Sequence, residues 1–153
     1  MHTPHILNSG ITQDVIFGEN VKIVQPVNLY GCTIGNNTFI GPFVEIQQNA
    51  SIGNNCKIQS HTFICEMVSI GNNCFVGHGV MFINDIFKEG KPAGGDRSQW
   101  LKTTIADNVF IGSNATILPV SICSNVTIGA GAVVTHDISE AGKYAGNPAR
   151  LLK

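Results

Sequence analysis

Aliphatic and aromatic side chains recur every six residues along most of the chain. The run from Ile34 to Phe82 has no gap, and a small or β-branched residue stands two positions before each member. A fixed repeat of this kind predicts an architecture built from one repeated structural unit. The positions that carry the period are Phe17, Ile23, Leu29, Ile34, Ile40, Ile46, Ile52, Ile58, Ile64, Ile70, Val76, Phe82, Ile105, Ile111, Ile117, Ile122, Ile128 and Val134.

The tetrapeptide Ile-Gly-Asn-Asn groups these hexads in threes, because it begins at Ile34, Ile52 and Ile70. The grouping predicts a three-sided β-solenoid with one short strand on each face and one coil for every 18 residues. About six coils then cover residues 17–136, with the periodic side chains stacked inward as a ladder from coil to coil. Strands of neighbouring coils should lie about 4.8 Å apart.

The six-residue spacing is broken at three places. It shortens to five after Leu29 and after Ile117, and it lengthens to 23 after Phe82. All three breaks fall at the corner between the third face of one coil and the first face of the next. The longest break predicts a protruding loop over residues 84–104, which carries the chain's only tryptophan, Trp100, and several charges. Loops of this length in compact domains are usually functional.

The rest of the chain adds no second domain. We expect residues 1–153 to form one β-helix domain, in which residues 1–16 cap the open end of the solenoid and Ile11 begins a partial turn. Bare strand ends invite aggregation, which is why a cap is expected there. Residues 137–153 are expected to leave the repeat and form a C-terminal segment.

Composition excludes several classes of function. The net charge is −1 and 12% of residues are charged, so no basic face for nucleic acid is expected. The chain has no apolar stretch of membrane-spanning length and no secretory signal, which favours a cytoplasmic protein. The five cysteines occupy positions of the repeat and include no Cys-x-x-Cys pair, which favours reduced thiols and no metal site.

The hexads, the long loop and the run Tyr144-Ala145-Gly146-Asn147-Pro148-Ala149-Arg150 together resemble the hexapeptide-repeat acyltransferases. The resemblance implies an all-β, left-handed parallel β-helix that works as a homotrimer. The left hand is taken from the resemblance, since crossover connections in general are right-handed.

A narrower resemblance concerns the sugar-modifying branch of that family. Residues 60–65 (Ser-His-Thr-Phe-Ile-Cys), residues 80–85 (Val-Met-Phe-Ile-Asn-Asp) and the loop run 92–96 with Trp100 are similar to N-acetyltransferases of nucleotide-linked 3-amino-3,6-dideoxyhexoses. This likeness implies acetyl-CoA as co-substrate and a dTDP-linked amino sugar as acceptor, in a pathway that supplies surface polysaccharide such as lipopolysaccharide.

Acetyl transfer to an amine requires an uncharged amine, a carbonyl within attack distance and donors for the developing oxyanion. Asn84 opens the loop, and the resemblance implies that its amide holds the sugar amine; alternatively, it only supports a left-handed turn. Asp85 is a candidate general base or amine-orienting carboxylate; alternatively, it accepts hydrogen bonds from the loop backbone. His78 and His61 occupy one corner in successive coils, where either can accept a proton or contact substrate, unless they are incidental surface residues.

The remaining candidates concern binding. In the loop, Arg97 and Trp100 are expected to hold the nucleotide, although Trp100 can equally anchor the loop to the solenoid. The resemblance implies a CoA groove along turns of the last two coils, whereas ordinary turn geometry explains the same glycines. Arg150 and Lys153 are candidate partners of the CoA phosphate, or else belong to a solvated tail. The candidate groove residues are Gly112, Ser113, Ala130 and Gly131.

Three other functions remain open. A metalloenzyme like the γ-class carbonic anhydrases needs three converging histidines, and the close histidine pair expected of that family is absent here. A non-catalytic β-solenoid scaffold is compatible with the regular coils but leaves the polar insertion unexplained. The third alternative keeps an acyltransferase and changes the acceptor amino sugar or the acyl donor.

Overall fold

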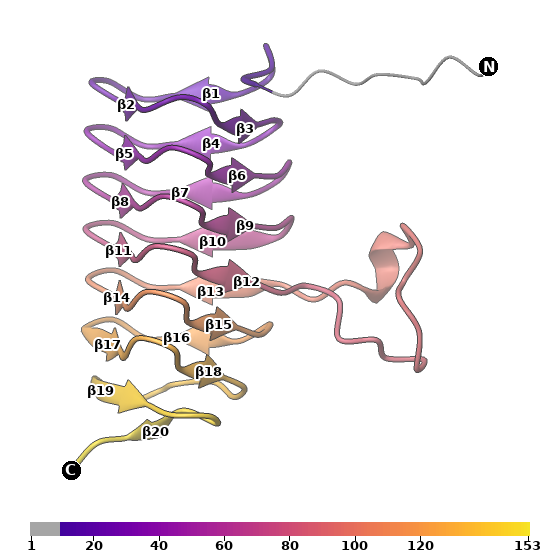
Figure 1. Cartoon of the computed structure of the whole chain (residues 1–153), viewed down its shortest axis with the longest axis vertical. Coiled ribbons are helices and arrows are strands. Elements are labelled where there is room, and N and C mark those ends of the chain that lie inside the picture. Colours follow the sequence, from indigo (N-terminus) through magenta and orange to yellow (C-terminus); the bar gives the residue numbers. More distant parts are fainter. Residues whose placement is uncertain (1–9) are drawn as a thin grey trace.

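The computed structural model describes residues 10–153, which wind into a three-sided prism of short parallel strands (Figure 1). Face 1 contains β1 (Ile16–Phe17), β4 (Thr33–Ile34), β7 (Ser51–Ile52), β10 (Val68–Ile70), β13 (Thr103–Ile105) and β16 (Ser121–Ile122). Face 2 contains β2 (Lys22–Ile23), β5 (Phe39–Ile40), β8 (Lys57–Ile58), β11 (Phe75–Val76), β14 (Phe110–Ile111), β17 (Val126–Ile128), β19 (Gly142–Ala145) and β20 (Arg150–Leu151). Face 3 contains β3 (Asn28–Leu29), β6 (Glu45–Ile46), β9 (Phe63–Ile64), β12 (Met81–Phe82), β15 (Thr116–Ile117) and β18 (Val133–Val134).

The chain visits the faces in the order 1, 2, 3 in each of six coils, and we name the corners 1–2, 2–3 and 3–1 after the faces that they join. The predicted fold class, an all-β left-handed parallel β-helix, is confirmed. The three breaks in spacing lie at corner 3–1, as predicted. The long loop joins β12 to β13 and projects from the prism between residues 83 and 102 (Figure 1).

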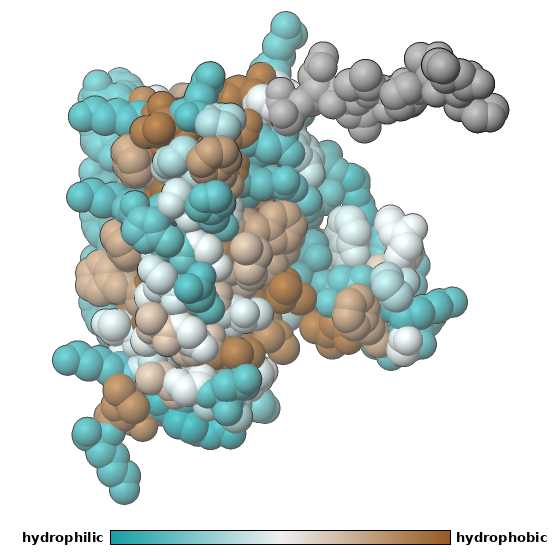
Figure 2. Space-filling view, in the orientation of Figure 1, coloured by the Kyte–Doolittle hydropathy of each residue, from teal (hydrophilic) through white to brown (hydrophobic). Residues whose placement is uncertain are grey.

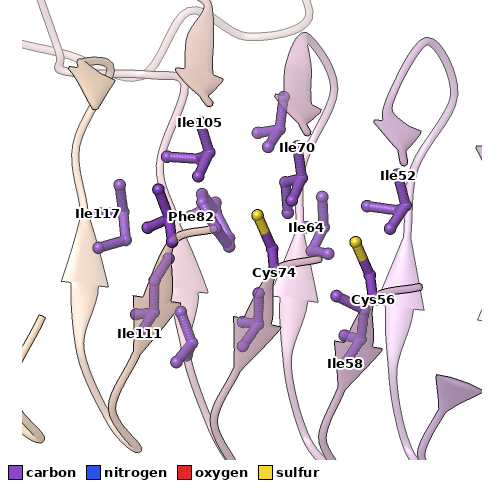
Figure 3. Close-up of a cluster of buried hydrophobic side chains, with 14 of the residues drawn as sticks. Ile52, Cys56, Ile58, Ile64, Ile70, Cys74, Phe82, Ile105, Ile111 and Ile117 are labelled. Atoms are coloured by element: carbon purple, nitrogen blue, oxygen red, sulfur yellow. The ribbon is translucent and has the colours of Figure 1, made fainter. Parts of the chain in front are cut away.

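The periodic side chains form the core. Ile58, Ile64 and Phe82 are completely buried, and their equivalents stack along the axis from coil to coil (Figure 3). The small residues two positions earlier, such as Cys56 and Cys74, fill the space between these larger side chains. Burial of each large side chain stabilises the fold by roughly 1.5–3 kcal/mol before chain entropy is subtracted.

Each position of the Ile-Gly-Asn-Asn tetrapeptide has its own structural role at corner 1–2. The isoleucine points inward, and a Cβ on Gly53 would lie 2.5 Å from the carbonyl oxygen of Gly71 in the next coil. The side-chain oxygen of Asn54 accepts a hydrogen bond from the backbone nitrogen of Asn36 at 2.7 Å. Asn55 has a φ of 56°, which asparagine adopts more readily than most residues. The repeat is therefore fixed by packing, by an asparagine ladder and by a left-handed turn.

Replacing Gly53 by alanine tests the close approach of these coils. The added methyl group would press on backbone, which cannot move aside like a flexible side chain, so we expect the free energy of unfolding to fall by about 1–3 kcal/mol. Thermal or denaturant unfolding measures the change. The control is Ser51→Ala in the same coil, which removes a half-buried hydroxyl hydrogen-bonded only to Ser69 among residues 10–153 and adds no atom, and an equal loss in both variants would contradict the packing argument.

The two ends of the prism differ in part from the prediction. At the start, Ile11 pairs with Leu29, so a partial turn does begin there, while Phe17 in the first coil remains 40% exposed. Residues 1–9 of the predicted cap lie outside the described residues. At the end, Ile138 pairs with Ile122 and β19 extends face 2. The C-terminal segment predicted for residues 137–153 therefore has no six-residue period, but it still pairs with face 1 through Ile138 and with face 2 through β19.

The cysteines are free thiols within the repeat. Cys32, Cys56, Cys65 and Cys74 are buried, and Cys123 is half-buried. Burial raises the pKa of Cys32 to about 11 and that of Cys65 to about 12, so both stay protonated and unreactive near neutral pH.

Candidate functional site

The long loop leaves the prism through a narrow neck. The backbone nitrogen of Leu101 donates a hydrogen bond to the carbonyl oxygen of Asn84 at 2.9 Å, which joins the first and last parts of the loop. Within the loop, a single 3-10 turn, η1 (Arg97–Gln99), is capped by Asp96. Hydrogen bonds from Ser98 and Gln99 lower the pKa of Asp96, so this carboxylate stays ionised and holds the turn.

Asp85 organises the base of the loop. One carboxylate oxygen accepts a hydrogen bond from the backbone nitrogen of Phe87 at 2.9 Å, and the other accepts one from Ala93 at 2.8 Å. Both oxygens therefore bind loop backbone, as in the turn-acceptor alternative. A role for Asp85 as a general base remains a prediction.

Asn84 lies at the mouth of the neck, half-buried, with its amide group in a defined orientation. Its side-chain nitrogen donates a hydrogen bond to the carbonyl oxygen of Glu66 at 3.3 Å. Asn84 does not have a positive φ, unlike Asn37, Asn55 and Asn73 of the repeat, so the left-handed-turn alternative is wrong. Because the amide nitrogen is held by Glu66, the amide oxygen is the atom left to accept a hydrogen bond from a bound amine.

Glu66 is a member of this site that the sequence did not reveal. It is only 6% exposed, although it carries a charge at corner 3–1 in the coil before the loop. One carboxylate oxygen accepts hydrogen bonds from the side chains of Gln48 at 2.8 Å and Arg97 at 3.3 Å. Arg97 thereby ties the loop to the prism through an ion pair. An acidic residue at the same corner one coil before the insertion was the available signal, but its partner 31 residues away was not readable from spacing.

Removing the charge of Glu66 tests this tie. In Glu66→Gln the ion pair with Arg97 is lost, so the loop should open more often and trypsin should cleave at Lys88 or Arg97 severalfold faster. Limited proteolysis followed by mass spectrometry measures the rate. Glu45→Gln is the matched control, because Glu45 contacts Gln47 on the same face and not the loop. Equal cleavage rates in wild type and Glu66→Gln would show that the pair does not hold the loop.

A second group of predicted residues stacks along corner 2–3. His61 and His78 lie there in successive coils, and the ring of His61 stacks on Phe43 at a centroid distance of 4.8 Å. The carbonyl oxygen of His78 accepts a hydrogen bond from Asn114, which follows Ser113 in the next coil. The backbone nitrogen of Gly131 then donates to Ser113 at 2.8 Å. His78 therefore lies in one continuous column with the candidate groove residues Ser113, Ala130 and Gly131, with Gly112 beside it.

Within one chain, the candidate residues at the base of the loop lie apart from those along corner 2–3. Asn84 and Asp85 follow β12 at corner 3–1, whereas His78 precedes β12 at corner 2–3. The width of face 3 separates these corners. A site that uses both groups must therefore extend across face 3 or include a second copy of the chain.

The remaining candidates stay predictions. Trp100 is half-buried beside the neck, which suits either contact with a ligand or anchoring of the loop. Arg150 is exposed in β20 and donates a hydrogen bond only to the backbone of Ala149 among residues 10–153. Lys153 is exposed at the end of the chain.

No group of three or more His, Cys, Asp or Glu side chains among residues 10–153 is placed to hold a metal ion. None of the helical segments in the same range has the length and apolar character needed to cross a membrane.

Comparison with known families matches the repeat on both sides of the loop. The family "Bacterial transferase hexapeptide (six repeats)" matches residues 31–66. The family "Hexapeptide repeat of succinyl-transferase" matches residues 67–81 and 102–136. Together the two matches span more than half of the chain, and the stretch between 81 and 102 that they skip is the loop.

A curated relative is similar over most of this chain. The bifunctional protein GlmU of Acinetobacter baumannii is 35% identical over 133 residues, which make up 86% of this chain and 27% of that protein. This chain therefore spans only about a quarter of the length of that relative.

Solved structures share the fold. AntD, an N-acyltransferase from Bacillus cereus in complex with dTDP and 3-hydroxybutyryl-CoA, superposes with a TM-score of 0.77 at 22% identity, covering 96% of this chain and 90% of that one. PerB from Caulobacter crescentus, in complex with CoA and GDP-perosamine, gives a TM-score of 0.65 at 18% identity, covering 94% of this chain and 56% of that one.

Proposed function

The chain belongs to the family of hexapeptide-repeat transferases, and from that premise we propose that it is a CoA-dependent N-acyltransferase acting on a nucleotide-linked amino sugar. The observation that carries the proposal is the amide of Asn84, fixed through its nitrogen and open at its oxygen at the mouth of the loop. The fold neighbours that were solved with CoA or acyl-CoA and with dTDP or GDP-perosamine support the same substrate classes.

The chemistry that this chain contributes is mainly positioning. The oxygen of Asn84 accepts a hydrogen bond from the sugar amine and aims its lone pair at the thioester carbonyl, which removes most of the entropic cost of the encounter. The loop, held by Glu66 and Arg97, covers the reacting groups and keeps water out. The amine attacks the carbonyl carbon, the C–S bond breaks, and CoA leaves as the thiol after taking up the proton that the amine loses.

More narrowly, we propose acetyl transfer to the 3-amino group of a dTDP-linked 3-amino-3,6-dideoxyhexose, in a pathway that supplies surface polysaccharide. Support comes from the order of motifs: residues 80–85 place Asn84 directly at the base of the loop that carries residues 92–96 and Trp100. His78 and His61 are candidate proton acceptors at corner 2–3. Acetyl-CoA is proposed to lie along the same corner, past Ser113, Ala130 and Gly131, with Arg150 and Lys153 near its phosphates.

We propose that the protein works as a homotrimer with one site between each pair of neighbouring prisms. Apolar side chains flank corner 2–3, where Phe43 is 56%, Phe75 36%, Met81 40% and Phe110 48% exposed. Figure 2 shows hydrophobic side chains gathered on the side of the prism that carries this corner, while the loop projects to the right. Covering these side chains with a second copy also brings residues of corner 3–1 and corner 2–3 from different chains to one site.

A thiol-release assay tests the proposal. Purified protein with acetyl-CoA and a small panel of dTDP- and UDP-linked amino sugars should release CoA with the dTDP-linked 3-amino-3,6-dideoxyhexoses and far more slowly with sugars that lack the amine. CoA release with only the UDP-linked sugars would show that the acceptor carries UDP rather than dTDP. Absence of release across a panel of acceptors and acyl donors would favour a non-catalytic scaffold.

A further inference from the structure

A hollow of about 640 Å³ lies on face 2, at the first three coils of the prism. At its centre are Lys22, Phe39 and Lys57, and at its margins are Asn20, Asn37 and Gln59. This volume lies within the range of about 300–1,000 Å³ that is typical of small-molecule sites. None of the residues discussed so far as catalytic or donor-binding lines it.

The floor of the hollow is set by the register of three strands. Phe39 in β5 pairs with Lys22 on one side and with Lys57 on the other, so an aromatic ring lies between two ammonium groups. Both lysines are exposed, and the one ion pair among residues 10–153 joins Arg97 to Glu66, so neither lysine is paired with a carboxylate there. Both ammonium groups are therefore available to an anionic ligand that enters the hollow.

The combination of groups indicates the class of ligand. The half-buried ring of Phe39 lines the hollow and offers a stacking surface for a planar base, and flanking ammonium groups bind phosphate oxygens. The amides of Asn20 and Asn37, joined by a hydrogen bond of 3.3 Å, add polar groups at one edge. We propose that this hollow binds the nucleoside diphosphate part of the acceptor sugar, an inference that rests on the proposed function for the identity of the sugar attached to it.

The position along the prism favours the acceptor over CoA, which also carries a nucleoside diphosphate. The hollow lies on coils 1 to 3, on the N-terminal side of the loop in coil 4. Ser113, Ala130 and Gly131 lie on the other side, in coils 5 and 6. Phe39 is two coils below Asn84, or about 10 Å along the axis. A nucleotide-linked sugar can therefore extend from the hollow up to the loop while CoA approaches from the opposite end.

The hollow and the loop of one chain cannot serve the same ligand. Face 2 is bounded by corners 1–2 and 2–3, whereas the loop leaves from corner 3–1 on the opposite side of the prism. The loop that closes over a nucleotide in this hollow must therefore belong to a neighbouring subunit. Each site is incomplete without a second copy of the chain.

Binding of dTDP without any sugar or CoA tests the hollow directly. By isothermal titration calorimetry, Lys22→Gln and Lys57→Gln should each weaken dTDP binding about tenfold, and the double variant on the order of a hundredfold. Lys143→Gln, on the same face but far from the hollow, is the matched control and should bind as wild type. Titration with 3′,5′-ADP, the nucleotide of CoA, should give the same affinity in wild type and in all four variants.

Two results would overturn the assignment. Wild-type affinity for dTDP in the double variant would remove the hollow from the acceptor site. Loss of 3′,5′-ADP binding with dTDP binding retained would assign the hollow to CoA.

Subunit mixing tests the shared site. We expect Asn84→Ala and the double lysine variant each to be nearly inactive alone. After joint refolding at equal amounts, about a quarter of wild-type activity should return, because each mixed trimer regains one intact site of three. No recovery in demonstrably mixed trimers would show that loop and hollow act within one chain.

These tests separate the two proposals. Lysine-dependent dTDP binding without acyl transfer to any amino sugar would support the hollow as a nucleotide-binding site and contradict the proposed function. Acyl transfer that is lost in Asn84→Ala and unaffected in the lysine variants would support the proposed function and show that the hollow does not bind the acceptor.

Discussion

Excising residues 86–100 and joining Asp85 to Leu101 through two glycines should reduce acyl transfer by about a thousandfold while leaving the prism folded. Activity should fall because the loop contributes Arg97 and Trp100 and closes the reacting groups off from water. The prism should survive because the same corner is crossed by only three residues between β15 and β16. The hydrogen bond from Leu101 to Asn84 can still close the shortened turn.

Steady-state kinetics with acetyl-CoA and the best acceptor measures the loss. Far-UV circular dichroism, thermal unfolding and size-exclusion chromatography establish that the shortened protein is folded and assembled. A folded, loopless protein that turns over like wild type would show that the loop does not close the site.

Asn84→Ala should lower kcat about a hundredfold, with a smaller effect on thermal stability. The substitution removes the oxygen that we propose holds the amine, and it also removes the hydrogen bond to the carbonyl oxygen of Glu66. Misalignment of the amine at the reacting centre can lower kcat about a hundredfold even when the substrate still binds. Asn84→Asp keeps an acceptor oxygen but cannot donate a hydrogen bond to Glu66, so its kcat should lie between that of wild type and that of Asn84→Ala.

The matched control is Asn28→Ala, because Asn28 is a half-buried asparagine of face 3 in the first coil, away from the loop. It should keep wild-type kcat and KM. Wild-type turnover in Asn84→Ala would remove this residue from the site and leave Asp85 or His78 as the group to test next.

The sequence predicted the fold almost completely because the repeat is imposed by local geometry. Every buried isoleucine from Ile34 to Ile128 belongs to the predicted period, and the loop leaves from the predicted corner. The continuation of faces 1 and 2 through Ile138 and β19 was missed because backbone pairing at a solenoid end needs no periodic side chain.

The site was less predictable, since it depends on contacts between residues that are distant in sequence. Asn84 and Asp85 were identified from their place at an insertion, but the roles of the Asp85 oxygens follow only from loop coordinates. Glu66 was missed because its partner Arg97 is brought back by the path of the loop. The division of the candidates between two corners also follows from the coil geometry, which a list of motif residues does not contain.

The central claim is that an acyl group moves from CoA to the nitrogen of a nucleotide-linked sugar on this prism. Incubation with [1-¹³C]acetyl-CoA and a dTDP-linked 3-amino-3,6-dideoxyhexose, followed by NMR of the product, tests it most directly. We predict one labelled amide carbonyl with a long-range coupling to the hydrogen on C3 of the sugar, formed with release of one CoA thiol. An ester carbonyl, or acetyl-CoA that the wild-type protein leaves unchanged, would contradict the account.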